Sequence, residues 1–169
     1  NLTSKLQYGA QPLRRRAVPV GAFLRRCAAQ FYESPAAGAS TVELEMPPAA
    51  EQTTLQADEA LLLRAMENIL HNAAAHNPAT VHITIRAEIV DAALTVRITD
   101  DGRGYPPAVL VALRTGETGE NTPHILGLHV VEQIMAAHGG TAAFAPNTPH
   151  GASVLLILPL PMKEREINH

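Results

Sequence analysis

The sequence predicts an α/β (α+β) two-layer sandwich, in which about three helices pack on one face of a mixed sheet of about five strands. Three observations support this fold class. Stretches with the 3.6-residue repeat of amphipathic helices alternate with stretches whose apolar residues recur at every second position. Proline and glycine separate these stretches. The chain finishes with two strand-like segments, "TAAFAP" and "GASVLLILPLP", which we expect to pair.

The composition excludes several classes of protein. The chain has 169 residues, of which 46% are hydrophobic, so it can bury a core and is not expected to be disordered. The formal net charge of −3 argues against a basic surface, and we expect no nucleic-acid partner. The apolar runs are shorter than the ~18 residues of a membrane span, so we expect no membrane contact by this segment. The first residue, Asn1, is not Met, which suggests a piece excised from a longer protein.

One domain is expected over residues 18–162. Residues 1–17 are interpreted as a fraying helix end followed by a linker, and residues 163–169 as a mobile polar tail. The single cysteine, Cys27, lies in the apolar run "FLRRCAAQF", which favours a buried structural thiol and a reducing compartment.

The N-terminal half is expected to hold two helices separated by a strand. Periodicity predicts the first helix over 20–33, and Pro35 follows it. "STVELEM" alternates apolar and polar residues, which is typical of a strand, and "PPAAEQTT" is interpreted as a loop. Asp58 is a candidate N-cap for the second helix, which Pro78 ends.

The C-terminal half is expected to begin with a hairpin. "TVHITIRAEIV" and "AALTVRITD" both alternate, with Asp91 at the turn between them. A glycine-rich break, a short helix at "PAVLVAL" and a flexible polar loop at "RTGETGENTPH" come next. A last helix at "GLHVVEQIMAAHGG" precedes the two closing strands.

Two asparagines lie on one stripe of the second helix, within "ENILHNAAAHNP". Asn is a poor interior helix residue, because its side chain competes for nearby backbone groups. Asn68 and Asn72 are four residues apart, on the border of the apolar face. The stripe is either the wall of a pocket or a solvent-facing edge.

The segment "ITDDGRGYP" follows the hairpin. Asp100 has the same parity as Leu94, Val96 and Ile98, so its carboxyl group is expected on the core side of the sheet. An unpaired carboxylate there is costly, and a backbone donor or a ligand is expected beside it. Glycines at 102 and 104 allow positive φ and close approach of a ligand, although a plain Asp-Gly turn has the same sequence.

The third candidate is "HILGLHVV". A glycine at a helix start, after a polar loop, leaves free N–H groups that suit a phosphate. An ordinary helix start is the alternative.

The order and spacing of these segments resemble the Bergerat-fold (GHKL) ATPases, and among them the catalytic and ATP-binding domain of sensor histidine kinases. The resemblance covers roughly residues 38–160. "ENILHNAAAHNP" is similar to the asparagine box of that family, "DDGRG" to its first glycine box and "ILGL" to its second. The opening twenty residues resemble the segment that leaves the family's dimerisation helices.

The resemblance implies a role for each of these residues. Asn72 would offer its amide oxygen to Mg²⁺, and Asn68 would lie near the phosphates and the metal-bound waters, which gives both a catalytic role. Asp100 would accept a hydrogen bond from the adenine amino group, and Gly102 and Gly104 would bring the backbone close to the base.

The lid over the phosphates would be residues 105–126. Gly127 and Leu128 would open the helix beneath them. His76, at the position of the usual tyrosine, is placed among the nucleotide-binding residues. Arg114 and His124 are either phosphate contacts or solvated lid residues.

The implied activity is that of a protein-histidine kinase. Its cofactors would be ATP and Mg²⁺, and the γ-phosphate would pass to a histidine on a dimerisation domain of the same protein, outside this chain. A response regulator would be the next partner. The hydrolytic relatives and the anti-sigma serine kinases have glutamate where this chain has Asn68, so transfer to histidine is favoured over hydrolysis and over a serine kinase. The location would be cytoplasmic, free or as part of a membrane-anchored sensor.

A degenerate nucleotide-binding or interaction module of the same fold, which regulates a partner by contact, is the alternative. Two departures support it: Ala75 stands where the family has lysine, and Ile125 stands at the first glycine of its GxGL motif.

Overall fold

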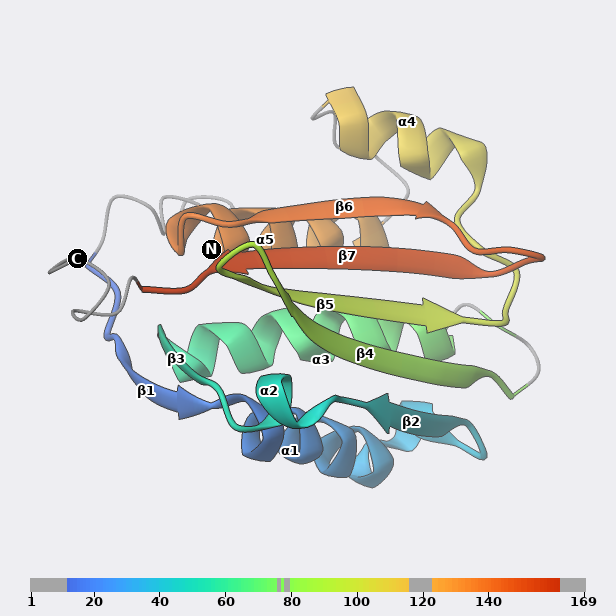
Figure 1. Ribbon diagram of the computed structural model, residues 1–169. Coiled ribbons are helices and arrows are strands. Elements are labelled where there is room, and N and C mark those ends of the chain that lie inside the picture. The colour runs from blue at the N-terminus through green and yellow to red at the C-terminus, as the bar shows by residue number, and fades with distance from the viewer. Residues whose placement is uncertain (1–11, 76, 78–79, 116–122, 162–169) are drawn as a thin grey trace, which may run out of the picture.

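The computed structural model describes residues 12–75, 77, 80–115 and 123–161, which form a five-stranded mixed sheet with helices against it (Figure 1). The strand order is β2-β4-β5-β7-β6, with β2 parallel to β4 and the other pairs antiparallel. The strands are β1 (Arg16–Pro19), β2 (Thr41–Glu45), β3 (Thr54–Ala57), β4 (His82–Val90), β5 (Ala93–Asp100), β6 (Thr141–Pro146) and β7 (Ala152–Pro159).

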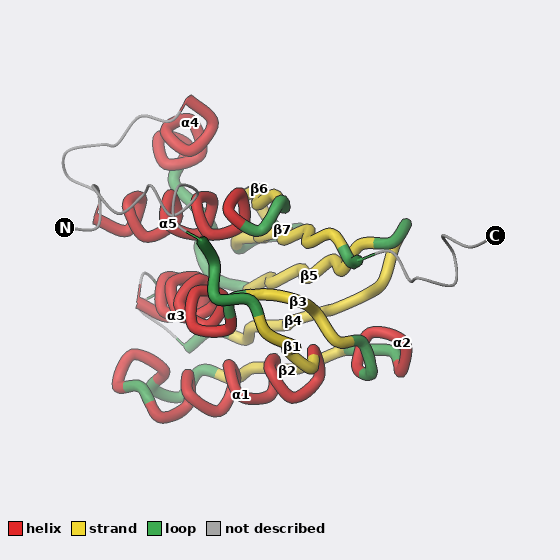
Figure 2. Tube along the Cα trace, turned by 90° about the vertical axis from the view of Figure 1, so that its left-hand side faces the viewer, coloured by secondary structure: helices red, strands yellow, loops and turns green. Residues whose placement is uncertain are grey.

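Three long helices cover one face of this sheet, as Figure 2 shows from the side. The middle helix contacts both of its neighbours. These three are α1 (Val20–Glu33), α3 (Glu59–Ala75) and α5 (Pro123–Ala137). A further helix, α4 (Pro107–Thr115), lies beyond the edge strand β6. The predicted sandwich, with its mixed sheet and helices on one face, is confirmed.

Alternation along the central hairpin builds the core. Ile83, Ile85 and Ala87 of β4 are fully buried, and Ile85 lies opposite Ile98 of β5. Side chains on a strand alternate between the two faces, so every second residue of both strands meets the helices. The two-residue turn at Asp91 and Ala92 has positive φ at both positions, which suits the twist of a tight hairpin.

A second, two-stranded sheet was not predicted. β1 pairs antiparallel with β3, with Arg16 opposite Ala57. The interpretation of "PPAAEQTT" as a loop was therefore wrong in part, because it contains the short helix α2 (Pro48–Glu51) and the first residue of β3. Strands of four residues show too little alternation to be recognised, and their partners are far apart in the sequence.

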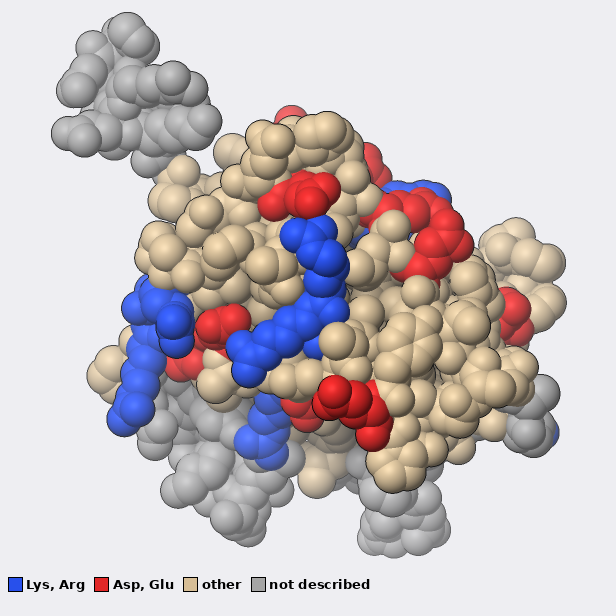
Figure 3. Space-filling view, turned by 90° about the horizontal axis from the view of Figure 1, so that it is seen from below, with Lys and Arg blue, Asp and Glu red and all other residues tan. Residues whose placement is uncertain are grey.

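The surface beneath α1 carries both signs of charge, as Figure 3 shows from below. Arg25 pairs with Glu51 at 2.9 Å, and Arg26 pairs with Glu59 at 3.1 Å. Both arginines are about half exposed, so these ion pairs contribute little to stability.

Cys27 is buried inside α1, as predicted. Burial, with the nearby Glu67 carboxylate, raises the pKa of its thiol to about 12, so the reactive thiolate is not formed near neutral pH. No described helix combines the length and the apolar character needed to cross a membrane. The expected tail, 163–169, and most of the expected polar loop, 116–122, lie outside the described residues.

Candidate functional site

A pocket of about 450 Å³ opens between the C-terminal part of α3 and the end of β5. This volume lies within the range of small-molecule sites. The described lining residues are Asn72, Ala73, Asn77, Asp100, Arg103, Gly104, Tyr105, Pro106, Pro107 and Ala152. We call this cavity the α3–β5 pocket.

Asp100, the last residue of β5, carries its carboxyl group on the core side, where alternation predicted it, and is 7% exposed. The backbone N–H groups of Gly102 and Ala152 donate to its Oδ1, at 2.8 and 3.2 Å. Burial raises the pKa of this carboxyl group despite these two hydrogen bonds. Both bonds use Oδ1, so Oδ2 is the oxygen that suits a donor group of a ligand.

The asparagine box is connected to the glycine-rich loop by Asn77. Its Nδ2 donates to the carbonyl oxygen of Ala73 at 2.6 Å, and its Oδ1 accepts from the N–H of Arg103 at 2.8 Å. A Cβ atom at Gly102 would overlap the Asn77 side chain. The structure therefore needs glycine at 102 for packing against Asn77, and close approach to a base remains a prediction.

The turn between β6 and β7 supports the same loop from the other side. Gly104, at φ +82°, lies so close to Gly151 that an added Cβ would be 2.6 Å from its carbonyl oxygen. Gly151, at φ +111°, lies against the backbone of Asp100. Asn147 donates from Nδ2 to the carbonyl oxygen of Asp100 at 3.0 Å. This turn therefore holds the end of β5 in place.

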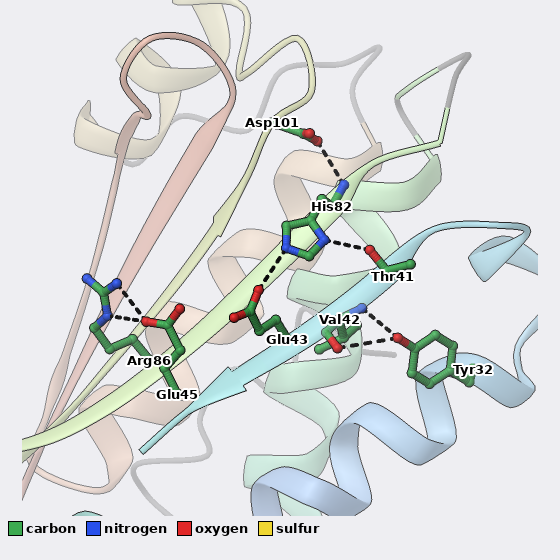
Figure 4. A network of polar contacts seen from close by, with 8 residues as sticks. All are labelled: Tyr32, Thr41, Val42, Glu43, Glu45, His82, Arg86 and Asp101. Carbon is green, nitrogen blue, oxygen red and sulfur yellow. Dashed lines mark hydrogen bonds and ion pairs between the residues drawn. The ribbon is translucent and has the colours of Figure 1, made fainter. Parts of the chain in front are cut away.

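A polar network on the outer edge of the sheet also reaches this loop (Figure 4). The N–H of His82 donates to Oδ1 of Asp101 at 2.8 Å, which joins the start of β4 to the residue after β5. The His82 ring contacts Thr41 Oγ1 at 2.6 Å and Glu43 Oε1 at 3.1 Å. Asp101 therefore points away from the core while its neighbour Asp100 points into it.

Asn72 has the chemistry of a cation ligand. It lines the α3–β5 pocket and is 8% exposed, and its Oδ1 has no hydrogen-bond partner among the described residues. An unsatisfied buried carbonyl oxygen costs free energy, and hard cations such as Mg²⁺ prefer oxygen ligands. The residue therefore fits the metal that the resemblance implies.

Asn68 has a different environment. Its Nδ2 donates to the carbonyl oxygen of Gly127 at 3.1 Å, which joins α3 to α5, and it is not among the lining residues of the pocket. The structure thus brings Asn72, Asp100 and Gly104 to one pocket and places Asn68 outside it.

The expectation that Gly127 and Leu128 open the last helix was wrong. α5 begins at Pro123, so Gly127 lies in its second turn. Proline is favoured at the first helical position because it has no N–H to satisfy. Leu128 is fully buried between α4 and α5, where it packs with Val109 and Leu113.

The remaining residues that were expected to bind the nucleotide do not line the α3–β5 pocket or lie outside the described residues. Arg114 is exposed in the last turn of α4, outside the lining of the α3–β5 pocket. Residues 107–115 of the expected lid form α4. His76, residues 116–122 of the lid and the side chains of His124 and Ile125 lie outside the described residues.

Sequence reasoning missed Asn77 and Gly151, and it placed Tyr105 only as the first residue of the lid, whereas Tyr105 lines the α3–β5 pocket. The "HNP" segment is a helix-end signal that would have flagged Asn77, and the "NTPHG" segment a turn signal for Gly151. The Tyr105 contacts are tertiary, and its sequence context carries no such signal.

A family model described as "Histidine kinase-, DNA gyrase B-, and HSP90-like ATPase" matches residues 57–162. Among curated proteins, the chain is 26% identical over 166 residues to the alginate biosynthesis sensor protein KinB of Pseudomonas aeruginosa. It is 24% identical over 163 residues to the sensor histidine kinase YvrG of Bacillus subtilis. Each match covers 93% of this chain but only 27% and 28% of those proteins, so the chain spans about a quarter of their length.

Solved structures share the fold. Full-length ShkA in complex with AMPPNP matches with a TM-score of 0.74 at 25% identity, over 95% of this chain and 34% of that one. The nucleotide-free catalytic domain of histidine kinase ThkA matches with a TM-score of 0.74 at 17% identity, over 88% of this chain and 97% of that domain. At that identity, the likeness to ThkA concerns the fold.

Proposed function

This chain belongs to the histidine kinase-, DNA gyrase B- and HSP90-like ATPase family, and its curated relatives are sensor histidine kinases. From this premise we propose that the α3–β5 pocket binds Mg·ATP and that the domain passes the γ-phosphate to a histidine on a separate dimerisation domain. The next partner is a response regulator. The reaction takes place in the cytoplasm, where both ATP and response regulators are found.

One observation carries the proposal: the same cavity is lined by a buried carboxyl group and by an amide oxygen that has no hydrogen-bond partner among the described residues. Asp100 offers Oδ2 to the adenine amino group, and Asn72 offers Oδ1 to the cation. Gly104 allows the backbone to turn beside the base with positive φ. An acceptor for the base and an oxygen ligand for the metal are what a Mg·nucleotide requires.

The residues of this chain act by binding and orientation. Asp100 and Asn72 are on a strand end and a helix, so the packed core holds both in place before the ligand arrives. Mg²⁺, when bound, supplies neutralisation of the phosphate charge. Phosphoryl transfer requires little more of the protein than such positioning.

Asn68 favours transfer to histidine over hydrolysis. Its amide group is neutral, and its Nδ2 is occupied by the carbonyl oxygen of Gly127. An amide cannot accept a proton from an attacking water, as the glutamate of the hydrolytic relatives does. Glu67, the adjacent carboxylate, is exposed and does not line the α3–β5 pocket.

The second candidate function is a degenerate nucleotide-binding or interaction module, and it is favoured by Ala75, which stands where the family has lysine. This residue is exposed at the last position of α3, so the charge of the usual lysine is missing there. Arg103 is the cationic side chain among the described lining residues. Under the kinase proposal, it is the residue that would supply the missing positive charge.

A transfer assay separates these functions. The chain is incubated with Mg²⁺, γ-labelled ATP and the histidine-bearing dimerisation domain of the same protein. The proposal predicts an acid-labile phosphohistidine, which is lost in Asn72→Ala. Release of inorganic phosphate without labelling would indicate a hydrolase, and neither product would leave the degenerate module.

A further inference from the structure

Asn77 follows α3 and uses both ends of its side-chain amide. Its Nδ2 donates at 2.6 Å to the carbonyl oxygen of Ala73, in the last turn of α3, where carbonyl groups lack an intrahelical partner. Its Oδ1 accepts from the N–H of Arg103 at 2.8 Å. Only one orientation of the amide satisfies both bonds, because a carbonyl oxygen needs an N–H donor and a backbone N–H needs an oxygen. All three residues line the α3–β5 pocket.

The same amide lies flat against Gly102. An added Cβ atom at residue 102 would overlap the carbon, oxygen and nitrogen atoms of the Asn77 amide group. The N–H of Gly102 in turn donates to Oδ1 of Asp100 at 2.8 Å. Asn77 therefore contacts two successive residues of the glycine-rich loop, and one of them is hydrogen-bonded to the carboxyl group that the proposed function assigns to the base.

Asn77 is also the described side chain that joins this loop to α3. The other side-chain hydrogen bonds described for residues 100–103 come from the strands and their turns: from the start of β4 at His82, and from Asn147 and His150 in the turn between β6 and β7. The two sides of the pocket, the helix and the end of β5, are thus connected at this point by one asparagine.

We propose that Asn77 is a positioning residue for the nucleotide: it ties the glycine-rich loop to α3 and so holds the loop beside Asp100 in its binding geometry before the nucleotide arrives, an inference that rests on the proposed function. It acts through the loop. Without the tie, only a fraction of the molecules has the loop in the binding position, and the apparent affinity falls by that fraction.

Asn77→Ala tests this role because it removes both hydrogen bonds. The affinity for a fluorescent, non-hydrolysable ATP analogue is measured with Mg²⁺ and with EDTA, at a temperature at which circular dichroism shows the variant to be folded. Affinity is expected to fall about tenfold in both conditions, the effect of a competent fraction of about one in ten. The ratio of the two affinities is expected to stay the same, because the cation ligand Asn72 is unchanged.

Thr53→Val is the matched control. Thr53 Oγ1 donates at 2.6 Å to the carbonyl oxygen of Ala49, four residues earlier, just as Asn77 Nδ2 donates to Ala73. Thr53 follows α2 and is not among the lining residues of the α3–β5 pocket. The substitution removes a bond of the same kind and length, and the nucleotide affinity is expected to equal that of the wild type.

Hydrogen exchange gives a second readout without nucleotide. The N–H of Arg103 is bonded to Asn77 itself, whereas the N–H of Gly102 is bonded to Asp100. Both are expected to exchange about tenfold faster in Asn77→Ala, and at the wild-type rate in Thr53→Val. Unchanged exchange at Gly102 would show that Asn77 does not hold the loop, and it would overturn the inference.

The binding outcomes are distinguishable. If the wild type binds the nucleotide and folded Asn77→Ala binds it equally well, the positioning role is wrong. A loss seen only with Mg²⁺ would place the effect on the cation, and an equal loss in Thr53→Val would make it a general effect of lower stability; each result overturns the inference. If the wild type itself binds no nucleotide, the proposed function fails, and this role fails with it.

Discussion

Asp100 carries a buried carboxyl group of which only Oδ1 is hydrogen-bonded to the backbone, and burial raises its pKa. The charged form is therefore held in an environment that disfavours it, without a cationic partner among the described residues in hydrogen-bonding distance. A carboxyl group with a raised pKa in a cleft is typical of a binding site, so we interpret Asp100 as a ligand-binding residue and not as a source of stability.

Asp100→Asn separates these two effects. The amide oxygen can still accept from Gly102 and Ala152, but an N–H group then faces the donor of the adenine. Nucleotide affinity is expected to fall about 10- to 100-fold, the penalty for a buried donor without a partner. The unfolding temperature is expected to be equal or higher, because the neutral amide costs less to bury. Tight nucleotide binding by the variant, measured by calorimetry, would contradict the role of Asp100.

Gly151 is a second residue whose identity the backbone dictates. It has φ +111°, and a Cβ atom there would overlap the carbonyl oxygen of Asp100. Gly151→Ala is expected to lower the free energy of unfolding by roughly 2–4 kcal/mol, through strain and displacement of the β5 end. Gly38→Ala, at φ +55° with open space around it, is the control, and about 1 kcal/mol is expected there. Urea denaturation compares them, and equal losses would contradict this account.

At the scale of elements, α3 organises the site through contacts along its length. Asp58 caps its start by accepting from the N–H of Leu61 at 3.2 Å. Asn68 joins its middle to α5, and Asn77 joins its end to the glycine-rich loop. The helix that carries Asn72 is therefore held at its start, middle and end, and Asn72 and Asp100 line the same pocket.

The contact between Asn77 and Gly102 predicts a non-additive pair of substitutions. Gly102→Ala is expected to be destabilising in the wild type, because the new methyl group overlaps the Asn77 side chain. In an Asn77→Ala background, the methyl group enters the vacated space, and the cost is expected to be much smaller. A double-mutant cycle by chemical denaturation measures this coupling. Additive effects would show that the two residues do not interact as described.

The C-terminal end of α5 predicts a dependence of stability on pH. His138 is 4% exposed; its Nδ1 binds the carbonyl oxygen of Ile134 at 2.8 Å, and its Nε2 accepts from the N–H of Asp58 at 3.0 Å. An accepting Nε2 requires the neutral ring, and burial lowers the pKa of this imidazole. The unfolded chain therefore binds a proton at higher pH than the folded one.

Stability is accordingly expected to be complete above the unfolded pKa of His138, about 6.5, and to fall as the pH drops below it. His138→Gln, which cannot titrate, is expected to flatten the curve of unfolding free energy between pH 7 and 5. An unchanged slope in the variant would assign the pH dependence to other groups.

At the scale of the whole molecule, the features that depend on local sequence pattern were predicted, and those that depend on long-range contacts were not. The helix at 20–33, the hairpin around Asp91 and the inward direction of Asp100 all follow from periodicity, which the sequence displays directly. The β1–β3 pairing does not, because strands of four residues carry almost no periodic signal. The start of α5 at Pro123 was recognisable from proline's preference for the first helical position.

The pocket shows the same division. Asn72 and Asp100 were predicted because each departs from the local pattern. Asn72 is a polar residue on the border of an apolar helix face, and Asp100 is a carboxylate at a strand position that otherwise holds apolar residues. Asn77 and Tyr105 show no such departure, because their contacts with Arg103 and Phe144 are formed only when the chain folds. Asn68 stands where the asparagine box predicts an asparagine, but its side-chain amide is hydrogen-bonded to Gly127 and joins α3 to α5.

Binding of Mg·ATP in the α3–β5 pocket is the central claim, and calorimetric titration tests it most directly. The chain is titrated with a non-hydrolysable ATP analogue and Mg²⁺, beside Asp100→Asn and Asn72→Ala. We predict binding by the wild type, about 10- to 100-fold weaker binding by Asp100→Asn, and loss of the Mg²⁺ dependence in Asn72→Ala. No binding by the folded wild type at millimolar nucleotide would contradict the claim.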